Sequence, residues 1–135
     1  MTQPCVTGPD KLVLAGSGCE STQATIQMTN AMAEAGADAA MVITPFYFKA
    51  KMMAGTVLED HFTAVADASR IPIILYSVPA NTGIDLAADT IIRLARHPNI
   101  IGIKESGGDV AKIGRLVAET AEHGFQGWTL DIYEL

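Results

Sequence analysis

Four short apolar runs divide the chain, and each has the length of a single strand. They cover residues 12–15, 39–43, 71–76 and 100–104, and all but the first are rich in isoleucine or valine. Near-continuous apolar runs are typical of strands that are buried on both faces, as the strands of parallel sheets are. The pattern therefore predicts four strands of a buried parallel sheet.

A segment with helical spacing of its apolar residues follows each predicted strand. The first spans residues 21–35, with Ser21 as a favourable N-cap and Gly36 as a favourable stop. The third begins near residue 85 and stops at residues 97–98, and Gly124 ends the fourth. The apolar positions that define the last three helices are Leu58, Phe62 and Val65, then Ile91, Leu94 and Ala95, then Val110, Ile113, Leu116 and Val117.

The resulting order is a strand followed by a helix, four times over, with a repeat of about 30 residues that suits right-handed crossovers between parallel strands. This α/β pattern fits a doubly wound open sheet or part of a (β/α)8 barrel. A full barrel needs eight units and about 250 residues, so four units would be a partial TIM barrel. We expect a leader over residues 1–10, a partial barrel over residues 11–126 and a divergent tail over residues 127–135. The stretch "FQGWTLDIYEL" in and before that tail could begin a fifth strand.

Composition argues against several classes of binding partner. The net charge is −6 and the pI is about 4.8, which argues against nucleic acid or an anionic membrane surface. No apolar run approaches the roughly 18 residues of a membrane span. Cys5 and Cys19 make no disulfide framework, and His61, His97 and His123 are too far apart to indicate a metal site. The start has neither a signal nor a transit peptide, so a chain made as written is expected to be cytoplasmic.

Polar side chains follow three of the predicted strands. Tyr47, Tyr76 and Lys104 stand at or just past the strand ends, with Ser106 beyond the lysine. Carboxyl ends of parallel strands share one face of an α/β fold, so these residues should converge. An amine between apolar walls is more readily neutral and can attack a carbonyl, while a nearby phenol moves protons.

Two alternatives stay open from the residues alone. Lys104 could instead pair with Glu105 or Glu20 at the rim, with both tyrosines serving as core residues. The turn at residues 16–18, Gly-Ser-Gly, resembles a phosphate-binding loop but lacks the third glycine, so a flavodoxin-like binding domain is the weaker hypothesis. Gly107 and Gly108 offer free backbone N–H groups beside Lys104, where a carboxylate could bind.

The stretches "YSVPANTGIDL" and "GIKESGGD" resemble a signature of the dihydrodipicolinate synthase / N-acetylneuraminate lyase superfamily. Its members are (β/α)8 class I aldolases that act on pyruvate-type 2-oxo acids. The stretches "LAGSGCESTQAT", "GADAAMVITPFYF" and "HPNIIGIKESGGDVAKIG" resemble its animal 4-hydroxy-2-oxoglutarate aldolases most closely. The similarity covers residues 11–126 and corresponds to the third through sixth βα units of the family.

The resemblance assigns roles to individual residues. Lys104 matches the lysine that forms the Schiff base, and Tyr76 matches the tyrosine that shuttles protons beside the bound keto acid. Tyr47 matches a tyrosine of the proton relay that typically acts across a subunit interface. Ser106 matches a small polar residue beside the lysine that contacts substrate, and Asn81 stands where dihydrodipicolinate synthases carry a carboxylate-binding arginine.

The function that the resemblance implies is cleavage of 4-hydroxy-2-oxoglutarate to pyruvate and glyoxylate, a step of hydroxyproline breakdown. It implies no metal or organic cofactor, a small 2-oxo acid substrate, a homo-oligomer and a mitochondrial location. The family's carboxylate-holding loop would lie upstream of Leu12, and its seventh and eighth strands would follow the tail, so we expect a shortened chain. Two other hypotheses remain: an inactive chain that interacts with full-length subunits, or another pyruvate aldolase or lyase of the superfamily.

Overall fold

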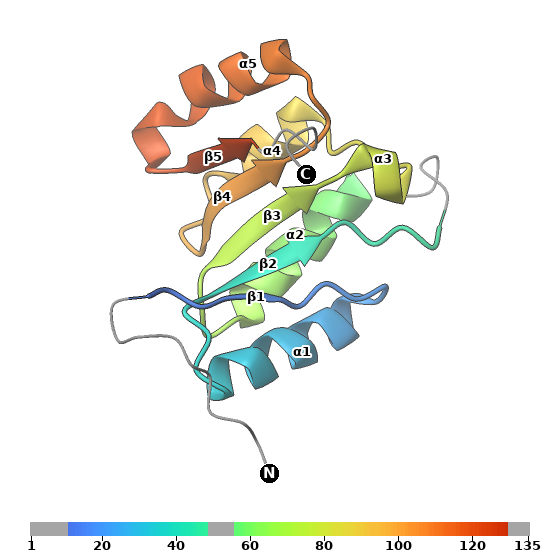
Figure 1. Cartoon of the computed structure of the whole chain (residues 1–135), viewed down its shortest axis with the longest axis vertical. Coiled ribbons are helices and arrows are strands. Elements are labelled where there is room, and N and C mark those ends of the chain that lie inside the picture. Colours follow the sequence, from blue (N-terminus) through green and yellow to red (C-terminus); the bar gives the residue numbers. More distant parts are fainter. Residues whose placement is uncertain (1–10, 49–55, 130–135) are drawn as a thin grey trace.

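The computed structural model describes residues 11–48 and 56–129, which form one five-stranded sheet with helices packed along it (Figure 1). Every strand runs parallel to its neighbours. The strands are β1 (Leu14–Gly16), β2 (Ala39–Ile43), β3 (Ile73–Ser77), β4 (Ile100–Glu105) and β5 (Gln126–Thr129). The helices are α1 (Thr22–Glu34), α2 (Thr56–Ala68), α3 (Pro79–Thr82), α4 (Ala88–Leu94) and α5 (Val110–Thr120), with a 3-10 turn η2 (Ala121–His123).

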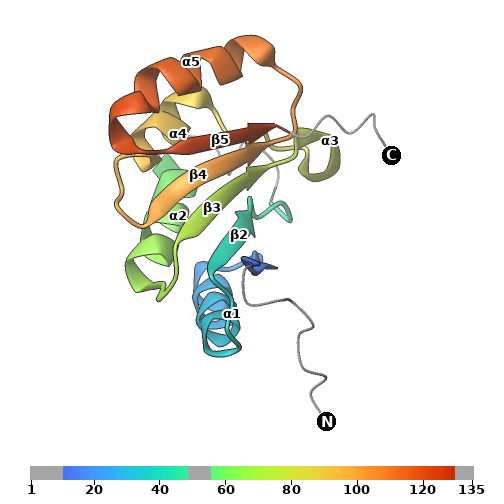
Figure 2. The same ribbon diagram turned by 60° about the vertical axis from the view of Figure 1, so that its left-hand side comes forward.

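The strand order β1-β2-β3-β4-β5 distinguishes the two architectures that the sequence allowed. A doubly wound sheet reverses its strand order at a switch point and carries helices on both faces. Here each strand lies beside the next one in the chain, and the helices lie on one side of the sheet (Figure 2). Within these residues α1 packs on α2, α2 on α4 and α4 on α5. This single direction of winding is that of a (β/α)8 barrel, so the expected partial barrel is confirmed.

The two faces of the sheet differ in their surroundings. Side chains alternate along a strand, so one set points to the helices and the other away from them. On the helix side, Val42, Leu75 and Ile103 pack with Phe62 and Leu116 in one continuous core. The other set is less enclosed: its half-buried members include Met41, Ile43, Tyr76 and Lys104.

The structure corrects several predicted boundaries. β1 begins at Leu14, two residues later than expected, and β3 begins at Ile73, directly after Pro72, which has no N–H to donate. The one-turn helix α3 was not predicted, and α4 begins at Ala88 instead of near residue 85. Gly83 ends α3 in the left-handed region, with φ of 68°, and residues 84–87 connect it to α4 without regular secondary structure.

Of the predictions for the two ends of the chain, the structure tests only the fifth strand. A fifth strand does form, and β5 crosses the expected boundary at residue 127. The leader over residues 1–10 and residues 130–135 of the tail lie outside the described residues, so the domain limits stay a prediction. Within the described residues, no helix is both long and apolar enough to cross a bilayer.

Helix capping follows the sequence closely. The Ser21 hydroxyl accepts a hydrogen bond from the Ala24 N–H at 3.1 Å, and the Asp109 carboxylate accepts one from the Lys112 N–H at 3.0 Å. The predicted apolar face of α5 is only partly buried: Leu116 is enclosed, whereas Val110 and Val117 are 79% and 59% exposed. Spacing alone cannot show how far a helix face is covered, because coverage depends on neighbouring elements.

His61 is the one histidine of the helix layer that is fully enclosed among the described residues. Its Nδ1 lies 2.9 Å from the Thr22 hydroxyl, and its ring meets Phe62 edge to face. Burial lowers the pKa of His61, and the nearby Glu20 carboxylate opposes that shift. The neutral imidazole is therefore the form that the folded core accepts.

We predict that Phe62→Ala lowers the free energy of unfolding by about 3–5 kcal/mol, because Phe62 is fully buried at the centre of the core. Urea denaturation measures the change. Val57→Ala in the same helix is the matched control, since Val57 is 46% exposed and its loss should have little effect. Equal losses in both variants would contradict the described core.

We also predict an acid-sensitive contribution from His61. A histidine with a lowered folded-state pKa stabilises the protein fully above the unfolded value of about 6.5, and that stability is lost as pH falls through the folded value. The urea midpoint should therefore fall less between about pH 7 and pH 5 in His61→Gln than in the parent protein. His123→Gln, at an exposed position, should follow the parent. An unchanged slope in His61→Gln would show that burial does not control this group.

Candidate active site

Lys104 and Tyr76 stand side by side on neighbouring strands. They are register partners of β4 and β3, and both are half-buried on the face turned away from the helices. The Lys104 Nζ lies 4.0 Å from the centroid of the Tyr76 ring. An ammonium over an aromatic face gains electrostatic attraction from the ring, so this contact holds the protonated side chain against Tyr76. The side chain has to lose that proton before its amine can attack a carbonyl. The structure thus brings together the two residues at the centre of the predicted site.

The rim salt bridge that the sequence left open for Lys104 does not form. No carboxylate among the described residues lies within salt-bridge distance of its Nζ. Glu105 instead approaches Lys112, with 2.7 Å between Oε2 and Nζ, and Glu20 accepts hydrogen bonds from the backbone N–H groups of Phe46 and Tyr47. Both candidate partners are therefore engaged elsewhere.

Ser106 joins the loops that follow β3 and β4. Its backbone N–H donates to the carbonyl of Ser77 at 2.9 Å. Its hydroxyl is buried and has no hydrogen-bond partner among the described residues. A buried hydroxyl without a partner costs free energy. The contact with substrate that was expected of Ser106 stays a prediction.

The backbone N–H of Gly107 is already hydrogen-bonded, although its predicted role requires a free N–H. Its N–H donates to Oε1 of Glu105 at 2.7 Å, so that amide is occupied in this structure. A Cβ at this position would lie 2.7 Å from the same oxygen and 3.4 Å from Pro79. The contact with substrate that was expected of Gly107 stays a prediction.

Tyr47 and Asn81 stand apart from the enclosed pair. Tyr47 is 78% exposed, its ring meets Phe48 edge to face, and its backbone N–H donates to Glu20 at 2.7 Å. Its hydroxyl has no hydrogen-bond partner among the described residues. Asn81 is exposed on the one-turn helix α3, four residues past the end of β3. Their predicted roles in the proton relay and in specificity stay predictions.

The buried pairing of Glu105 with Lys112 escaped the sequence reasoning, in which Glu105 was only a possible partner of Lys104. Glu105 and Lys112 form the buried ion pair, and Lys112 also meets the Asp85 carboxylate at 2.5 Å. Thr44 is completely buried at the end of β2, and its N–H donates to the Tyr76 carbonyl at 3.3 Å. The only signal was a lysine within the apolar face of a helix, which identifies no partner by itself.

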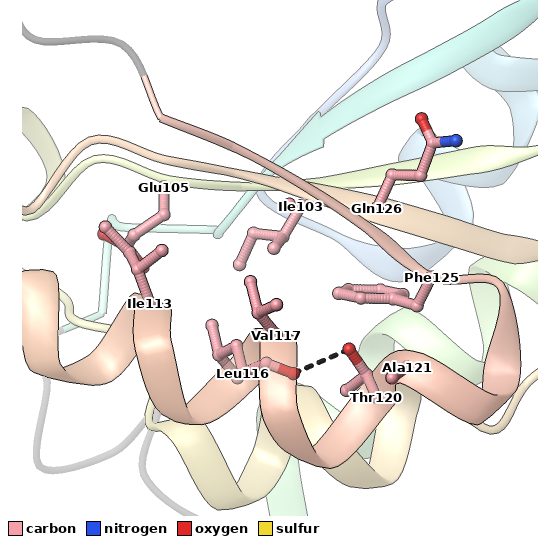
Figure 3. Close-up of a pocket in the computed structure, with 10 residues that line it drawn as sticks. Ile103, Glu105, Ile113, Leu116, Val117, Thr120, Ala121, Phe125 and Gln126 are labelled. Carbon is pink, nitrogen blue, oxygen red and sulfur yellow. Dashed lines mark hydrogen bonds between the residues drawn. The ribbon is translucent and has the colours of Figure 1, made fainter.

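A hollow of about 320 Å³ lies between α5, β4 and β5, on the helix side of the sheet (Figure 3). Ile103, Leu116, Val117 and Phe125 give it mostly apolar walls, and Glu105 reaches its edge. It is therefore on the opposite face from the Lys104 amine. No group of three histidine, cysteine or acidic residues suited to a metal occurs in the part of the chain that the structure describes.

Comparison with known proteins places this geometry in one family. The family model described as the dihydrodipicolinate synthetase family matches residues 2–129. A 4-hydroxy-tetrahydrodipicolinate synthase of Methanoculleus marisnigri is 45% identical over 113 residues, which cover 84% of this chain and 38% of that protein. A protein of Emericella nidulans named "Probable 4-hydroxy-2-oxoglutarate aldolase, mitochondrial" is 44% identical over 108 residues, covering 79% and 35%.

Solved structures agree with the sequence relatives. The dihydrodipicolinate synthase of Acinetobacter baumannii, complexed with pyruvate, matches with a TM-score of 0.83 and 39% identity, over 91% of this chain and 41% of that one. YagE of E. coli, also in complex with pyruvate, matches with a TM-score of 0.80 and 33% identity, over 90% and 41%. The chain spans well under half of the proteins that it matches.

These relatives correct one expectation. They do not support a special similarity to animal 4-hydroxy-2-oxoglutarate aldolases, because several relatives of comparable identity are named as synthases. They do support the superfamily, through sequence, strand order and fold together. Because the family model covers residues 2–129, the chain belongs to the dihydrodipicolinate synthetase family.

Proposed function

We propose that the protein is a pyruvate-dependent aldolase or lyase in which Lys104 forms a Schiff base with a 2-oxo acid. The observation that carries the proposal is the 4.0 Å approach of the Lys104 Nζ to the Tyr76 ring, away from any carboxylate of the described residues. An amine used as a nucleophile has to be free of ion pairs that hold it in the ammonium form. A phenol beside it can relay protons.

The first half of the reaction makes the imine. The neutral amine of Lys104 attacks the C2 ketone, and the carbonyl oxygen takes a proton to give a carbinolamine. Loss of that hydroxyl as water leaves a protonated imine bonded to Nζ. Tyr76 is the group that we assign to these proton transfers, since its ring already lies against the amine. The protonated imine then withdraws electrons, so this chemistry needs neither a metal nor an organic cofactor.

The substrate that we propose is 4-hydroxy-2-oxoglutarate. A base, assigned to the Tyr76 phenolate, takes the C4 hydroxyl proton, the C3–C4 bond breaks, and glyoxylate leaves. The electron pair of that bond forms an enamine, which takes a proton at C3 and is hydrolysed to pyruvate and free Lys104. The relative in Emericella nidulans supports this substrate. The family resemblance supports it too, because it implies an arginine in the synthases where this chain has Asn81.

A second candidate is the condensation that gives the synthases their name. The relatives in Methanoculleus marisnigri and Exiguobacterium sibiricum, at 45% and 50% identity, favour it. Both candidates share the imine at Lys104 and differ in the second reactant. Assaying pyruvate release from 4-hydroxy-2-oxoglutarate beside consumption of pyruvate with aspartate semialdehyde distinguishes them.

The proposal extends to assembly and location. Phe46, Tyr47 and Phe48 follow β2 as an aromatic trio, and all three are about half or more exposed. Exposed aromatic clusters are typical of protein interfaces, which supports a homo-oligomer with Tyr47 at its contact. A mitochondrial location rests on the name of the relative in Emericella nidulans. If no imine forms, a non-catalytic chain that binds other subunits becomes the better hypothesis.

We predict that borohydride in the presence of pyruvate traps an adduct on Lys104, because the imine is reduced to a stable secondary amine. Lys104→Arg should abolish the adduct, since a guanidinium stays protonated and cannot act as nucleophile. Lys11→Arg, at an exposed position, should leave it unchanged. Peptide mass spectrometry locates the added mass, and an adduct on a different lysine would refute the assignment.

We predict a different effect for Tyr76→Phe. The amine remains, so trapping at Lys104 should persist, but cleavage of 4-hydroxy-2-oxoglutarate should fall by about a hundredfold or more, because loss of general acid–base catalysis typically costs 10²–10⁴-fold. A coupled assay for pyruvate release measures the rate. Cleavage close to that of the parent protein would exclude the Tyr76 hydroxyl from the proton transfers.

A further inference from the structure

The Glu105–Lys112 pair is the most enclosed ion pair among the described residues. Its side chains are 2% and 7% exposed. Every other ion pair of the described residues, including that of Lys112 with Asp85, has at least one partner that is more than 40% exposed. Removing two charges from water is expensive, and apolar residues of similar size often serve stability as well or better. Stability alone is therefore a poor explanation for this pair.

The pair connects the segments that carry the site. Glu105 is the last residue of β4, directly after Lys104, and Lys112 lies in the first turn of α5. Oε1 of Glu105 accepts the Gly107 N–H at 2.7 Å, while Lys112 also reaches Asp85 in the extended stretch after α3. One buried carboxylate thus holds the loop after Lys104 and, through Lys112, the segment that follows Tyr76.

The direction of the Lys104 side chain depends on this anchorage. Neighbouring residues of a strand point to opposite faces, so a Glu105 side chain fixed on the helix side directs Lys104 to the other side. Lys112 approaches Oε2 of Glu105 as an ion pair and not as a well-directed hydrogen bond. The orientation of the carboxylate plane therefore depends on the hydrogen bond from the Gly107 N–H to Oε1. The backbone bond from Ser106 to Ser77 keeps the two strand ends in register.

We infer that Glu105 and Lys112 are positioning residues, and that their ion pair holds the Lys104 amine at the Tyr76 ring in the geometry that imine formation requires. Neither residue touches the reacting atoms, since both point to the helix side of the sheet. The inference rests on the proposed Schiff-base function. It goes beyond that function because it assigns the correct placement of the Lys104 amine to an ion pair on the opposite face of the sheet.

The test compares four variants with the parent protein, using the maximal rate of borohydride trapping and the pyruvate concentration for half-maximal trapping. Lys112→Met removes the pair, Lys112→Arg keeps its charge, and Glu105→Gln/Lys112→Met removes both charges so that no buried charge is left alone. Arg115→Met is the matched control: it deletes contacts of the same helix to Asp89 and Glu119 at 2.5 and 2.7 Å, at an exposed position.

The expected result is a loss in rate rather than in binding. A small displacement of a reacting group can reduce a rate about a hundredfold, so the maximal trapping rate should fall about 10- to 100-fold in Lys112→Met and in the double variant. The half-maximal pyruvate concentration should stay within about twofold, and Lys112→Arg should recover most of the rate. Arg115→Met should match the parent. Rates are expressed per folded molecule, from thermal unfolding of each variant.

Two outcomes would overturn the inference. One is a trapping rate per folded molecule in both Lys112→Met and the double variant that equals that of the parent. The other is an equal loss in Arg115→Met, which would show a general effect of loosening α5.

A parent protein that traps no pyruvate would refute the proposed function but leave the inference testable. Acetylation of Lys104 relative to Lys11, followed by mass spectrometry, reports how firmly the amine is held. The ratio should change at least about threefold in Lys112→Met and stay constant in Arg115→Met. A constant ratio in both variants would then reject the positioning role on its own.

Discussion

The alternation of side chains along β3 and β4 separates two environments within one sheet. Leu75 and Ile103 point to the helices and complete the apolar core, while Tyr76 and Lys104, one residue further along, point away from it. Because the strands pair in parallel register, the two polar side chains meet at the same height. Core formation and placement of the amine are therefore the same event, and a slip of one residue in the register would destroy both.

The candidate site has an enclosed part and an exposed part. Lys104, Tyr76 and Ser106 are held by strand pairing and by the backbone bond to Ser77. Tyr47 and Asn81 lie on short exposed segments, where a side chain has few neighbours to fix it. Enclosed residues are suited to the chemical step that a whole family shares. Exposed loop residues tolerate change, so they are suited to discrimination between substrates. This division is consistent with relatives of similar identity that carry different names.

The sequence predicted those features that depend on near neighbours. The strand–helix order, the cap at Ser21, and the place of Lys104 at the end of a strand all follow from local pattern. The helix α3 was missed because Pro79 to Thr82 makes a single turn with no periodicity to detect. The contact between Glu105 and Lys112 was missed because it forms only once α5 packs on the sheet. The choice between barrel and doubly wound sheet needed the strand order, which no local pattern contains.

The tight packing around Gly107 also bears on how such a sequence can change over evolutionary time. An added Cβ would press on the Glu105 carboxylate, so a larger residue at position 107 becomes acceptable only after position 105 has shortened or turned. Shortening position 105 first would leave the ammonium of Lys112 without its enclosed partner. The effects of substitutions at these three positions are therefore coupled, and they should not add.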